Sequence, residues 1–347
     1  MTRASTCTSH FGWEDFASTG NSQRHSRCPV EACDSPPLAT GKSETFCPVH
    51  GLNLHPNTYV YFNGADPQSR AIASLRNFDI EPELAERVVL HSKLKVETHR
   101  LGHEMSEDAL SWNVFVGLLS ANRLRAATEW LTRRSISREP DLYLWGLRVN
   151  RSALDQGVYP PLVETRERLE RDIRKFWTEP DVMLVIPGEL VVCIEAKFGS
   201  GNPLAFAGTV APGEKPCDAR GLIERYLDPA KERTRKRFLA QRFDGKLHSQ
   251  LFRNLIFASE MADDADWHVV NLVSRTLWNR GGAAKYSYED PTPDIQKFLQ
   301  QECHRCFSFR YWEDLYRSVI ASEPDLDRVA RYMERKSAHY KPAFSLN

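Results

Sequence analysis

Apolar residues form two short continuous runs near the middle of the chain, at residues 182–186 and 190–194. Pro187, Gly188 and Glu189 separate them, and both runs are rich in β-branched and aliphatic residues. This pattern predicts a β-hairpin. Neither run alternates with polar residues, so both faces of each strand are expected to be buried in the centre of a sheet.

The surrounding sequence adds helical periodicity and further strands. Ser106 is the expected N-cap of a helix in which Leu110, Val114 and Leu118 recur at helical spacing. Other predicted helices are 80–90, 163–177, 250–261 and several within 310–337, and other predicted strands are 58–63, 141–149 and 267–274. These elements predict an α/β fold with a mixed central sheet flanked by helices.

The same pattern divides the chain into five segments. We expect a disordered N-terminus at 1–26, because it is rich in Ser and Thr without apolar periodicity. The others are a zinc-binding segment (27–60), a connecting region (61–103), an α/β core (104–280) and C-terminal helices (281–347).

Charge and composition limit the kinds of partner and the cellular compartment that we expect for this protein. The 347 residues contain 46 Lys and Arg against 46 Asp and Glu, so any basic surface for nucleic acid must be local. The sequence contains no apolar run of about eighteen residues and no apolar signal core at its N-terminus, so we expect a cytoplasmic protein without a membrane partner. In that compartment the eight cysteines are expected to be thiols or metal ligands.

Cysteine and histidine spacing predicts a zinc site. Cys28 and Cys33 form a C-x4-C pair, and Cys47 and His50 form a C-x2-H pair. Four such ligands suit a structural Zn²⁺ with no open position, and the metal would fold a segment too small for its own core. The alternative is three reduced thiols and a histidine in a loop. Cys7 with His10 is a weaker signal, and Cys303 and Cys306 are expected to be two free thiols.

Charged residues at the ends of the central hairpin predict a second site. Glu195 and Lys197 share one face of their strand, and a three-residue loop places Asp181 opposite Glu195 on that face. Two facing carboxylates favour a bound cation, and their hard oxygens suit Mg²⁺ or Mn²⁺. The alternative is a buried salt bridge between Lys197 and one of the carboxylates.

The Pro180-Asp181 pair followed by Glu195-x-Lys197 resembles the PD-(D/E)xK nuclease superfamily, whose fold is that of restriction endonucleases. The resemblance implies an α-β-β-β-α-β core, metal binding by Asp181, Glu195 and the Ala196 carbonyl, and a water-orienting role for Lys197. It also implies a glutamate on the preceding helix, for which Glu107 is the first choice and Glu104 the second, and a glutamine on the following helix, Gln250. The same EPD triplet at 139–141 and 323–325 is not followed by a strand ending in Glu-x-Lys.

The most basic stretch of the chain is residues 231–246. On a helix it could contact phosphates, although charge runs more often form solvated faces. The predicted nucleic-acid-binding residues are Arg233, Arg235, Lys236, Arg237 and Arg253.

The resulting hypothesis is a metal-dependent nuclease of PD-(D/E)xK type that hydrolyses DNA, and the resemblance alone suggests restriction or phage defence. The alternative is a non-catalytic nucleic-acid-binding or regulatory zinc protein with a degenerate nuclease fold. The sequence does not decide whether the substrate is DNA or RNA, whether cutting is internal or from the ends, or which sequence is cut. It also leaves open whether the protein forms a homodimer or binds a partner protein.

Overall fold

The computed structural model describes residues 16–17, 27–39, 45–55, 58–61, 72–91, 101–150, 157–173, 177–204, 219–239, 247–278 and 286–346. The chain forms two compact units. Unit 1 contains residues 1–113 and 328–341, and unit 2 contains 114–327 and 342–347. These limits differ from the five predicted segments, because the C-terminal part of the chain contributes to both units.

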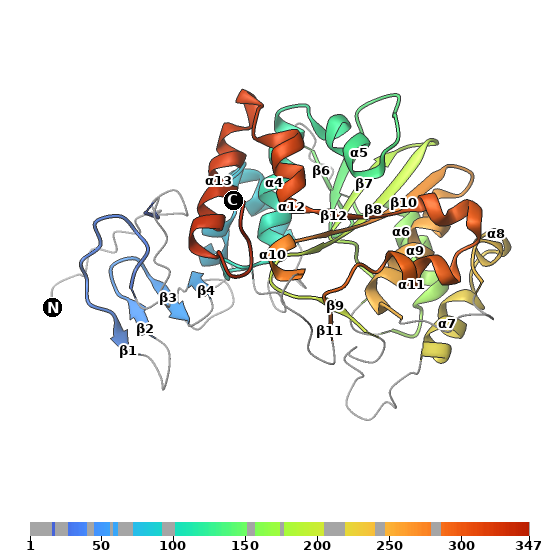
Figure 1. The fold of residues 1–347 in the computed structure, drawn as a ribbon, viewed down its shortest axis with the longest axis horizontal. Helices are drawn as coiled ribbons and strands as arrows, with labels where there is room; N and C mark the ends of the chain where they lie inside the picture. Colours follow the sequence, from blue (N-terminus) through green and yellow to red (C-terminus); the bar gives the residue numbers. More distant parts are fainter. Residues whose placement is uncertain are drawn as a thin grey trace. The chain divides into compact units, whose positions relative to one another are not determined.

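Unit 2 is built on a six-stranded mixed sheet with the order β12-β10-β8-β7-β5-β6 (Figure 1). Its central strand β8 is antiparallel to β7 and parallel to β10, which is in turn parallel to β12. The strands are β5 (Asp141–Leu144), β6 (Leu147–Val149), β7 (Val182–Ile186), β8 (Leu190–Lys197), β10 (Asp266–Val273) and β12 (Phe307–Tyr311).

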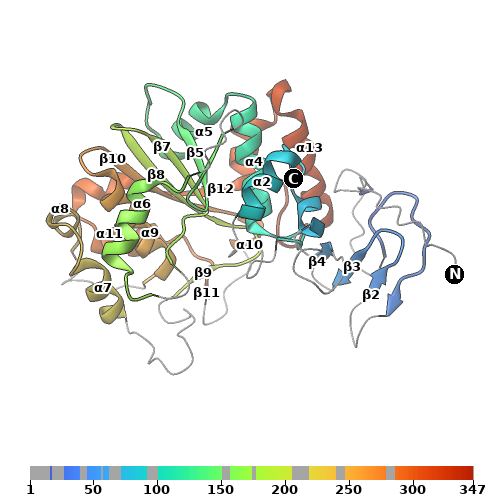
Figure 2. The ribbon, with the colours of Figure 1, turned by 180° about the vertical axis from the view of Figure 1, so that it is seen from behind.

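Helices cover both faces of this sheet, as predicted for an α/β fold (Figure 2). α9 (Ser249–Ala262) packs its apolar side against Met183, Val185 and Cys193 on one face. α5 (Leu124–Thr132) contacts β10 and β12 from the other face. The other helices of unit 2 are α6 (Pro160–Leu169), α7 (Ala219–Leu227), α8 (Glu232–Lys236), α10 (Arg275–Trp278), α11 (Thr292–Phe298), η4 (Gln301–Cys306), α12 (Trp312–Leu315), η5 (Tyr316–Ile320) and η6 (Pro324–Leu326). A small separate sheet pairs β9 (Asn202–Pro203) with β11 (Tyr286–Ser287).

The register of the central hairpin is the predicted one. Ile186 pairs with Leu190, which leaves the three-residue loop 187–189, and Val182 pairs with Ile194. Gly188 has a φ of 75°, the left-handed conformation that a three-residue hairpin loop requires and that glycine adopts without strain. One further step along this register sets Asp181 opposite Glu195.

The predicted single strand at 141–149 is wrong, because the chain reverses within it. β5 and β6 pair as an antiparallel hairpin, joined by Trp145 and Gly146 with φ values of 55° and 81°. Two positive φ values are what a tight type I′ turn needs. A Cβ on Gly146 would lie 2.6 Å from Leu162 Cδ2, so the turn also depends on close packing against α6. The turn was not predicted because apolar residues on both sides of it make the sequence look like one continuous strand.

The predicted helix at 163–177 begins earlier and ends at Leu169. The next residue, Glu170, is buried, and its carboxylate accepts hydrogen bonds from Thr178 N (2.8 Å) and Tyr226 Oη (2.7 Å). A buried carboxylate needs hydrogen-bond partners, and these partners lie in the segment that leads to the hairpin. The chain therefore leaves the helix at this point.

Within the predicted disordered N-terminus, the structure describes Phe16 and Ala17. Phe16 is buried, forms a bridge with Val30, and packs edge-on against Tyr59 with ring centroids 5.6 Å apart. The predictions for the rest of 1–26, including Cys7 and His10, fall outside the described residues. The predicted C-terminal helices also contain a strand, β12, whose five residues complete the parallel edge of the sheet of unit 2.

Unit 1 contains a four-stranded antiparallel sheet in sequential order, with a small aromatic core. The strands are β1 (Leu38–Ala39), β2 (Thr45–Cys47), β3 (Leu52–His55) and β4 (Thr58–Tyr61). Its helices are η2 (Leu75–Asn77), α2 (Pro82–His91) and parts of α4 (Glu107–Ser120) and α13 (Asp327–His339). Ser106 caps α4 as predicted, since its hydroxyl accepts a hydrogen bond from Ala109 N at 3.3 Å.

A buried ion pair attaches α13 to the rest of unit 1. The ammonium of Lys336 contacts the Glu104 carboxylate and donates to the Glu104 backbone oxygen at 2.6 Å. Lys336 is 2 % exposed and Glu104 is 1 % exposed. Burial lowers the pKa of Lys336, and the negative charge of Glu104 opposes that shift.

Replacing Lys336 with Met is expected to destabilise unit 1 by about 3–5 kcal/mol, because Glu104 would remain buried without a positive partner. Urea unfolding followed by far-UV circular dichroism measures the change. The double variant Lys336→Met with Glu104→Gln is the matched control and should recover much of the loss. Equal stability of the wild type and the Lys336→Met variant would show that the pair does not hold α13.

Candidate metal centres and candidate active site

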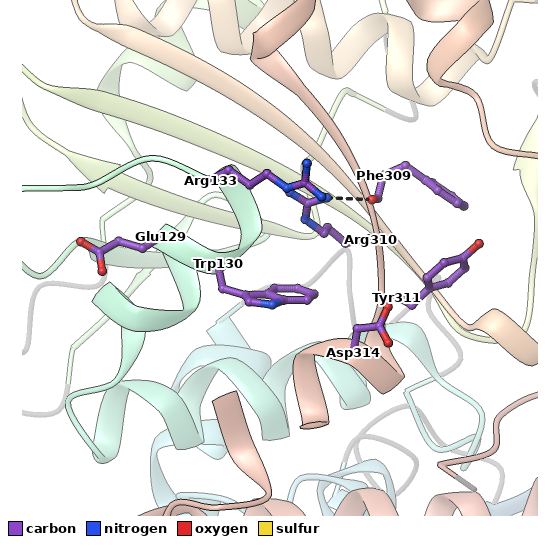
Figure 3. A pocket seen from close by; sticks show the side chains of 7 residues that line it. All are labelled: Glu129, Trp130, Arg133, Phe309, Arg310, Tyr311 and Asp314. Carbon is purple, nitrogen blue, oxygen red and sulfur yellow. Dashed lines mark hydrogen bonds between the residues drawn. The ribbon is translucent and has the colours of Figure 1, made fainter. Parts of the chain in front are cut away.

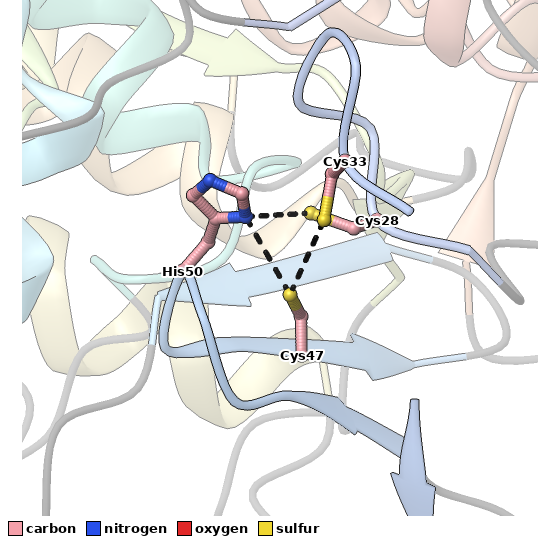
Figure 4. Close-up of side chains that lie close together, drawn as sticks. All are labelled: Cys28, Cys33, Cys47 and His50. Atoms are coloured by element: carbon pink, nitrogen blue, oxygen red, sulfur yellow. Dashed lines mark hydrogen bonds between the residues drawn. The ribbon is translucent and has the colours of Figure 1, made fainter. Parts of the chain in front are cut away.

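The four predicted zinc ligands lie together in unit 1 (Figure 4). Cys28 Sγ lies 3.4 Å and Cys47 Sγ 3.5 Å from His50 Nδ1, and Cys33 Sγ lies 3.8 Å from Cys47 Sγ. All four ligand atoms lie within 4.8 Å of one another. This cluster can bind a metal ion such as zinc.

The distances match the edges of a zinc tetrahedron. Bonds of about 2.3 Å to sulfur and 2.0–2.1 Å to nitrogen give edges of about 3.8 Å between sulfurs and about 3.5 Å between sulfur and nitrogen. Two backbone turns create this arrangement: Cys33 N donates to Val30 O (3.2 Å), and Gly51 N donates to Cys47 O (2.9 Å). Burial is the main cause that raises the pKa of the Cys28 thiol, and a bound cation would favour its thiolate form.

The central hairpin positions the second site in unit 2. Glu195 and Lys197, on β8, are 3 % and 4 % exposed, while Asp181 is half-buried immediately before β7. Lys197 Nζ lies 2.5 Å from Glu195 Oε1, and Asp181 Oδ2 accepts a hydrogen bond of 2.8 Å from Ala196 N. The hairpin therefore gathers two carboxylates and one ammonium at one end of the sheet.

Asparagine side chains from neighbouring elements surround Glu195. Asn254 Nδ2, from α9, donates to Glu195 Oε2 at 2.8 Å, and Asn271 Nδ2, from β10, donates to Glu195 O at 3.2 Å. Asn202 Nδ2 donates in turn to Asn271 Oδ1 at 2.7 Å. From the sequence, Asn254 is expected only on a turn near Gln250, with a role in the site and a polar contact at the rim of the core both open, and Asn202 and Asn271 are not assigned to the site. The available signal was that Asn254 lies one helical turn after Gln250.

The same contacts also fit the alternative of a structural salt bridge. One oxygen of Glu195 contacts Lys197 and the other contacts Asn254, so the carboxylate is hydrogen-bonded without a metal. The chemistry of the group favours a cation, since Asp181, Glu195 and Lys197 together carry two negative charges and one positive charge. Hard carboxylate oxygens at such a site fit Mg²⁺ or Mn²⁺.

The weaker predicted site residues have different surroundings. Gln250 lies one turn before Asn254 on α9, on the helix face that approaches Glu195. Glu107 is the first residue of α4 and belongs to unit 1, so its role in the site of unit 2 stays a prediction. Glu104, the second choice, is bound to Lys336. Arg253 interacts electrostatically with Tyr226.

The basic stretch does not reach this site in the described part of the chain. Arg233 pairs with Asp263 and Asp264, which precede β10, whereas Asn271 beside Glu195 lies near the other end of that strand. The five residue-to-residue steps along β10 from Asp266 to Asn271 span about 17 Å.

Local partners also hold the other predicted nucleic-acid contacts in this stretch. Lys236 pairs with Glu232, Arg235 donates to Asp228 O, and Arg237 donates to Ser259 Oγ. Of these contacts, only that of Arg237 reaches α9; the contact of Lys236 lies within α8, and that of Arg235 joins α8 to the residue after α7. The described helix is only five residues long, and residues 240–246 lie outside the description.

Cys303 and Cys306 form no disulfide. The hydrogen bond from Cys303 is the main cause that lowers the pKa of Cys306, and the same bond raises that of Cys303.

No protein-family model, curated protein or solved structure matches this chain. None of the helices in the described ranges combines the length and apolar character needed to cross a bilayer.

Proposed function

We propose that this protein is a metal-dependent nuclease that hydrolyses phosphodiester bonds in DNA. The observation that supports this proposal is the register of β7 and β8, which sets Asp181 opposite Glu195 and places Lys197 on the same strand face as Glu195. Nothing in hairpin packing requires three ionisable groups at the buried end of a central strand, and burying them is costly unless they act together.

The order of elements around the hairpin supports the restriction-endonuclease-like fold. α4, β5, β7, β8, α9 and β10 occur along the chain in the order α-β-β-β-α-β, with α5, β6, α6, β9, α7 and α8 as additional elements between them. α9 returns the chain between the parallel strands β8 and β10 and thereby brings Asn254 to Glu195.

Each residue then has a defined role. Asp181, Glu195 and the Ala196 carbonyl would hold Mg²⁺ or Mn²⁺, which supplies Lewis-acid stabilisation of phosphate charge and a more acidic bound water. Lys197 would orient the attacking water and balance developing negative charge. Asn254 would hold the orientation of the Glu195 carboxylate, and Gln250, one turn earlier on α9, would contact substrate.

For unit 1 we propose a structural Zn²⁺ bound by Cys28, Cys33, Cys47 and His50. Four protein ligands leave no open coordination position, so this ion would stabilise the fold and take no part in hydrolysis.

One observation favours the non-catalytic alternative. Both carboxylate oxygens of Glu195 already have partners, which is the arrangement expected of a structural ion pair in a degenerate nuclease fold. In that case the protein would bind nucleic acid or a regulatory partner without cutting.

Incubation of the full chain with supercoiled plasmid, linear duplex, single-stranded DNA and RNA tests the proposal. We expect cutting with Mg²⁺ or Mn²⁺ and none with EDTA, because the carboxylates alone cannot stabilise the transition state. Nicking of plasmid would indicate an endonuclease and end-trimming an exonuclease. Intact substrates with every cation would favour the non-catalytic alternative.

A further inference from the structure

A hollow of about 410 Å³ opens beside the edge strand β12, within unit 2 (Figure 3). Trp130 and Arg133 from the end of α5 and Arg310 from β12 line it. A second hollow of about 700 Å³ shares Arg133 and Arg310 and adds Arg305. Their sizes lie in the range of small-molecule sites.

None of these three arginines forms an ion pair with an acidic residue in the described part of the chain. Arg133 and Arg305 make no hydrogen bond or ion pair there, and Arg310 donates only to the adjacent Phe309 O at 3.3 Å. Burial and the positive charge of Arg133 lower the pKa of Arg310, and the negative charge of Asp314 opposes that shift. Guanidinium groups gathered without a counter-charge favour a bound anion.

The acidic residues that line the two hollows are bound elsewhere. Glu129 accepts from Arg125 and Ile136 N, and Asp314 accepts from Arg275 and Arg317. In the second hollow Asp266 pairs with Arg134, and Asp290 accepts from Thr292 N. None of these carboxylates forms an ion pair with Arg133, Arg305 or Arg310 in the described part of the chain, although the charge of Asp314 favours the charged form of Arg310.

The backbone at Arg133 gives an independent indication. This residue ends α5 in the left-handed conformation, with a φ of 56°. Glycine or asparagine is preferred at that position, and a longer side chain there is strained. A strained arginine whose guanidinium has no partner in the described chain is better explained by a ligand than by folding.

Arg310 adds a flat surface to the site. Its guanidinium carbon lies 5.6 Å from the centroid of the Trp130 ring. Such a guanidinium–indole stack can pack against a nucleobase, while its outward N–H groups reach a phosphate.

We propose that the hollow lined by Trp130, Arg133 and Arg310 is a binding site for a phosphate group carried by a nucleotide, either free or within a nucleic-acid strand. The site is separate from the carboxylate pair. Leu272 pairs with both Arg310 and Ala196, so Arg310 shares the sheet face of Ala196, opposite that of Glu195 and Lys197. The proposal therefore does not rest on nuclease activity.

Fluorescence anisotropy of the full chain with a labelled 5′-phosphorylated single-stranded oligonucleotide, without added divalent cation, tests the site. ATP and inorganic phosphate serve as competitors. We expect Arg133→Gly and Arg310→Gln each to weaken binding about 10- to 100-fold, because each removes a charge-assisted hydrogen bond. Arg133→Gly should melt at or above the wild-type temperature, because glycine adopts the positive φ without strain.

Arg225→Gln is the control, because Arg225 is exposed on α7 and lines neither hollow. It should bind as the wild type does. Competition by ATP would identify a free nucleotide, and oligonucleotide binding that ATP does not displace would identify strand phosphate; both support the site. Equal competition by inorganic phosphate and ATP would overturn the role assigned to the base. Wild-type protein that binds none of the three, or unchanged affinity in both arginine variants, would overturn the proposal as a whole.

Discussion

Replacing Asp181 with Asn is expected to lower metal-dependent DNA cutting by about 10²- to 10³-fold or more, while leaving the fold intact. The amide oxygen can still accept the hydrogen bond from Ala196 N, but it no longer offers a charged ligand to the cation. Initial rates of plasmid cleavage in Mg²⁺, with the melting temperature of each protein, measure both effects.

Asp181 is a sharper test than Glu195 or Lys197. Removing either member of that buried pair leaves the other charge unpaired, which costs about 3–5 kcal/mol and confounds loss of activity with loss of fold. Asp181 is only half-buried, and its carboxylate accepts a hydrogen bond from the backbone N–H of Ala196.

The chain supplies a matched control in a second Glu-Pro-Asp triplet. Asp141 follows Glu139 and Pro140, begins β5, and pairs with Arg148 at 2.7 Å. Asp141→Asn should cut DNA at nearly the wild-type rate. Equal losses in the Asp141 and Asp181 variants, or wild-type activity in Asp181→Asn, would remove Asp181 from the catalytic role.

Replacing Cys47 with Ser is expected to unfold the N-terminal part of unit 1. Structural Zn²⁺ contributes about 10–16 kcal/mol of apparent binding free energy in small zinc modules, comparable with or larger than the whole stability of most domains. Cys47 is fully buried at the end of β2. Its loss therefore removes a metal ligand at a position where no water molecule can bind the metal instead. Native mass spectrometry should find about one zinc in the wild type and none in the variant.

Limited proteolysis then locates the unfolding. Cleavage of the Cys47→Ser variant should appear first within residues 27–61. Cys303→Ser is the control, because Cys303 is also buried but lies in unit 2, outside the cluster. It should retain zinc and the wild-type cleavage pattern. A zinc-free wild type that resists proteolysis in this segment would contradict the structural role.

Local chemistry explains which sequence-based predictions succeeded. The hairpin loop was predictable because Pro187, Gly188 and Glu189 interrupt two apolar runs, and the two-residue period of a strand then fixes which side chains face one another. The metal cluster of unit 1 was predictable because ligand spacing reflects backbone turns of fixed length, which Cys33 and Gly51 make.

Predictions failed where distant residues decide local structure. The turn at Trp145 and Gly146 is stabilised by packing on α6, and the end of α6 depends on Thr178 and Tyr226 binding the Glu170 carboxylate. The net charge of the basic stretch 231–246 can be read from the sequence. The acidic partner of Arg233, Asp263, lies about thirty residues further along the chain, at the end of α9, so the ion pair could not be predicted.

By itself, the sequence determined the α/β class, the three ionisable groups of the hairpin and the four ligands of the metal cluster, because each depends on residues close together along the chain. Only the tertiary structure decided that Asn254 and Asn271 hold Glu195, that Glu104 is bound to Lys336, and that Arg133 and Arg310 meet at the edge of the sheet. Those contacts join residues that are far apart in the sequence. They depend on burial and side-chain geometry, which the spacing of nearby residues does not indicate.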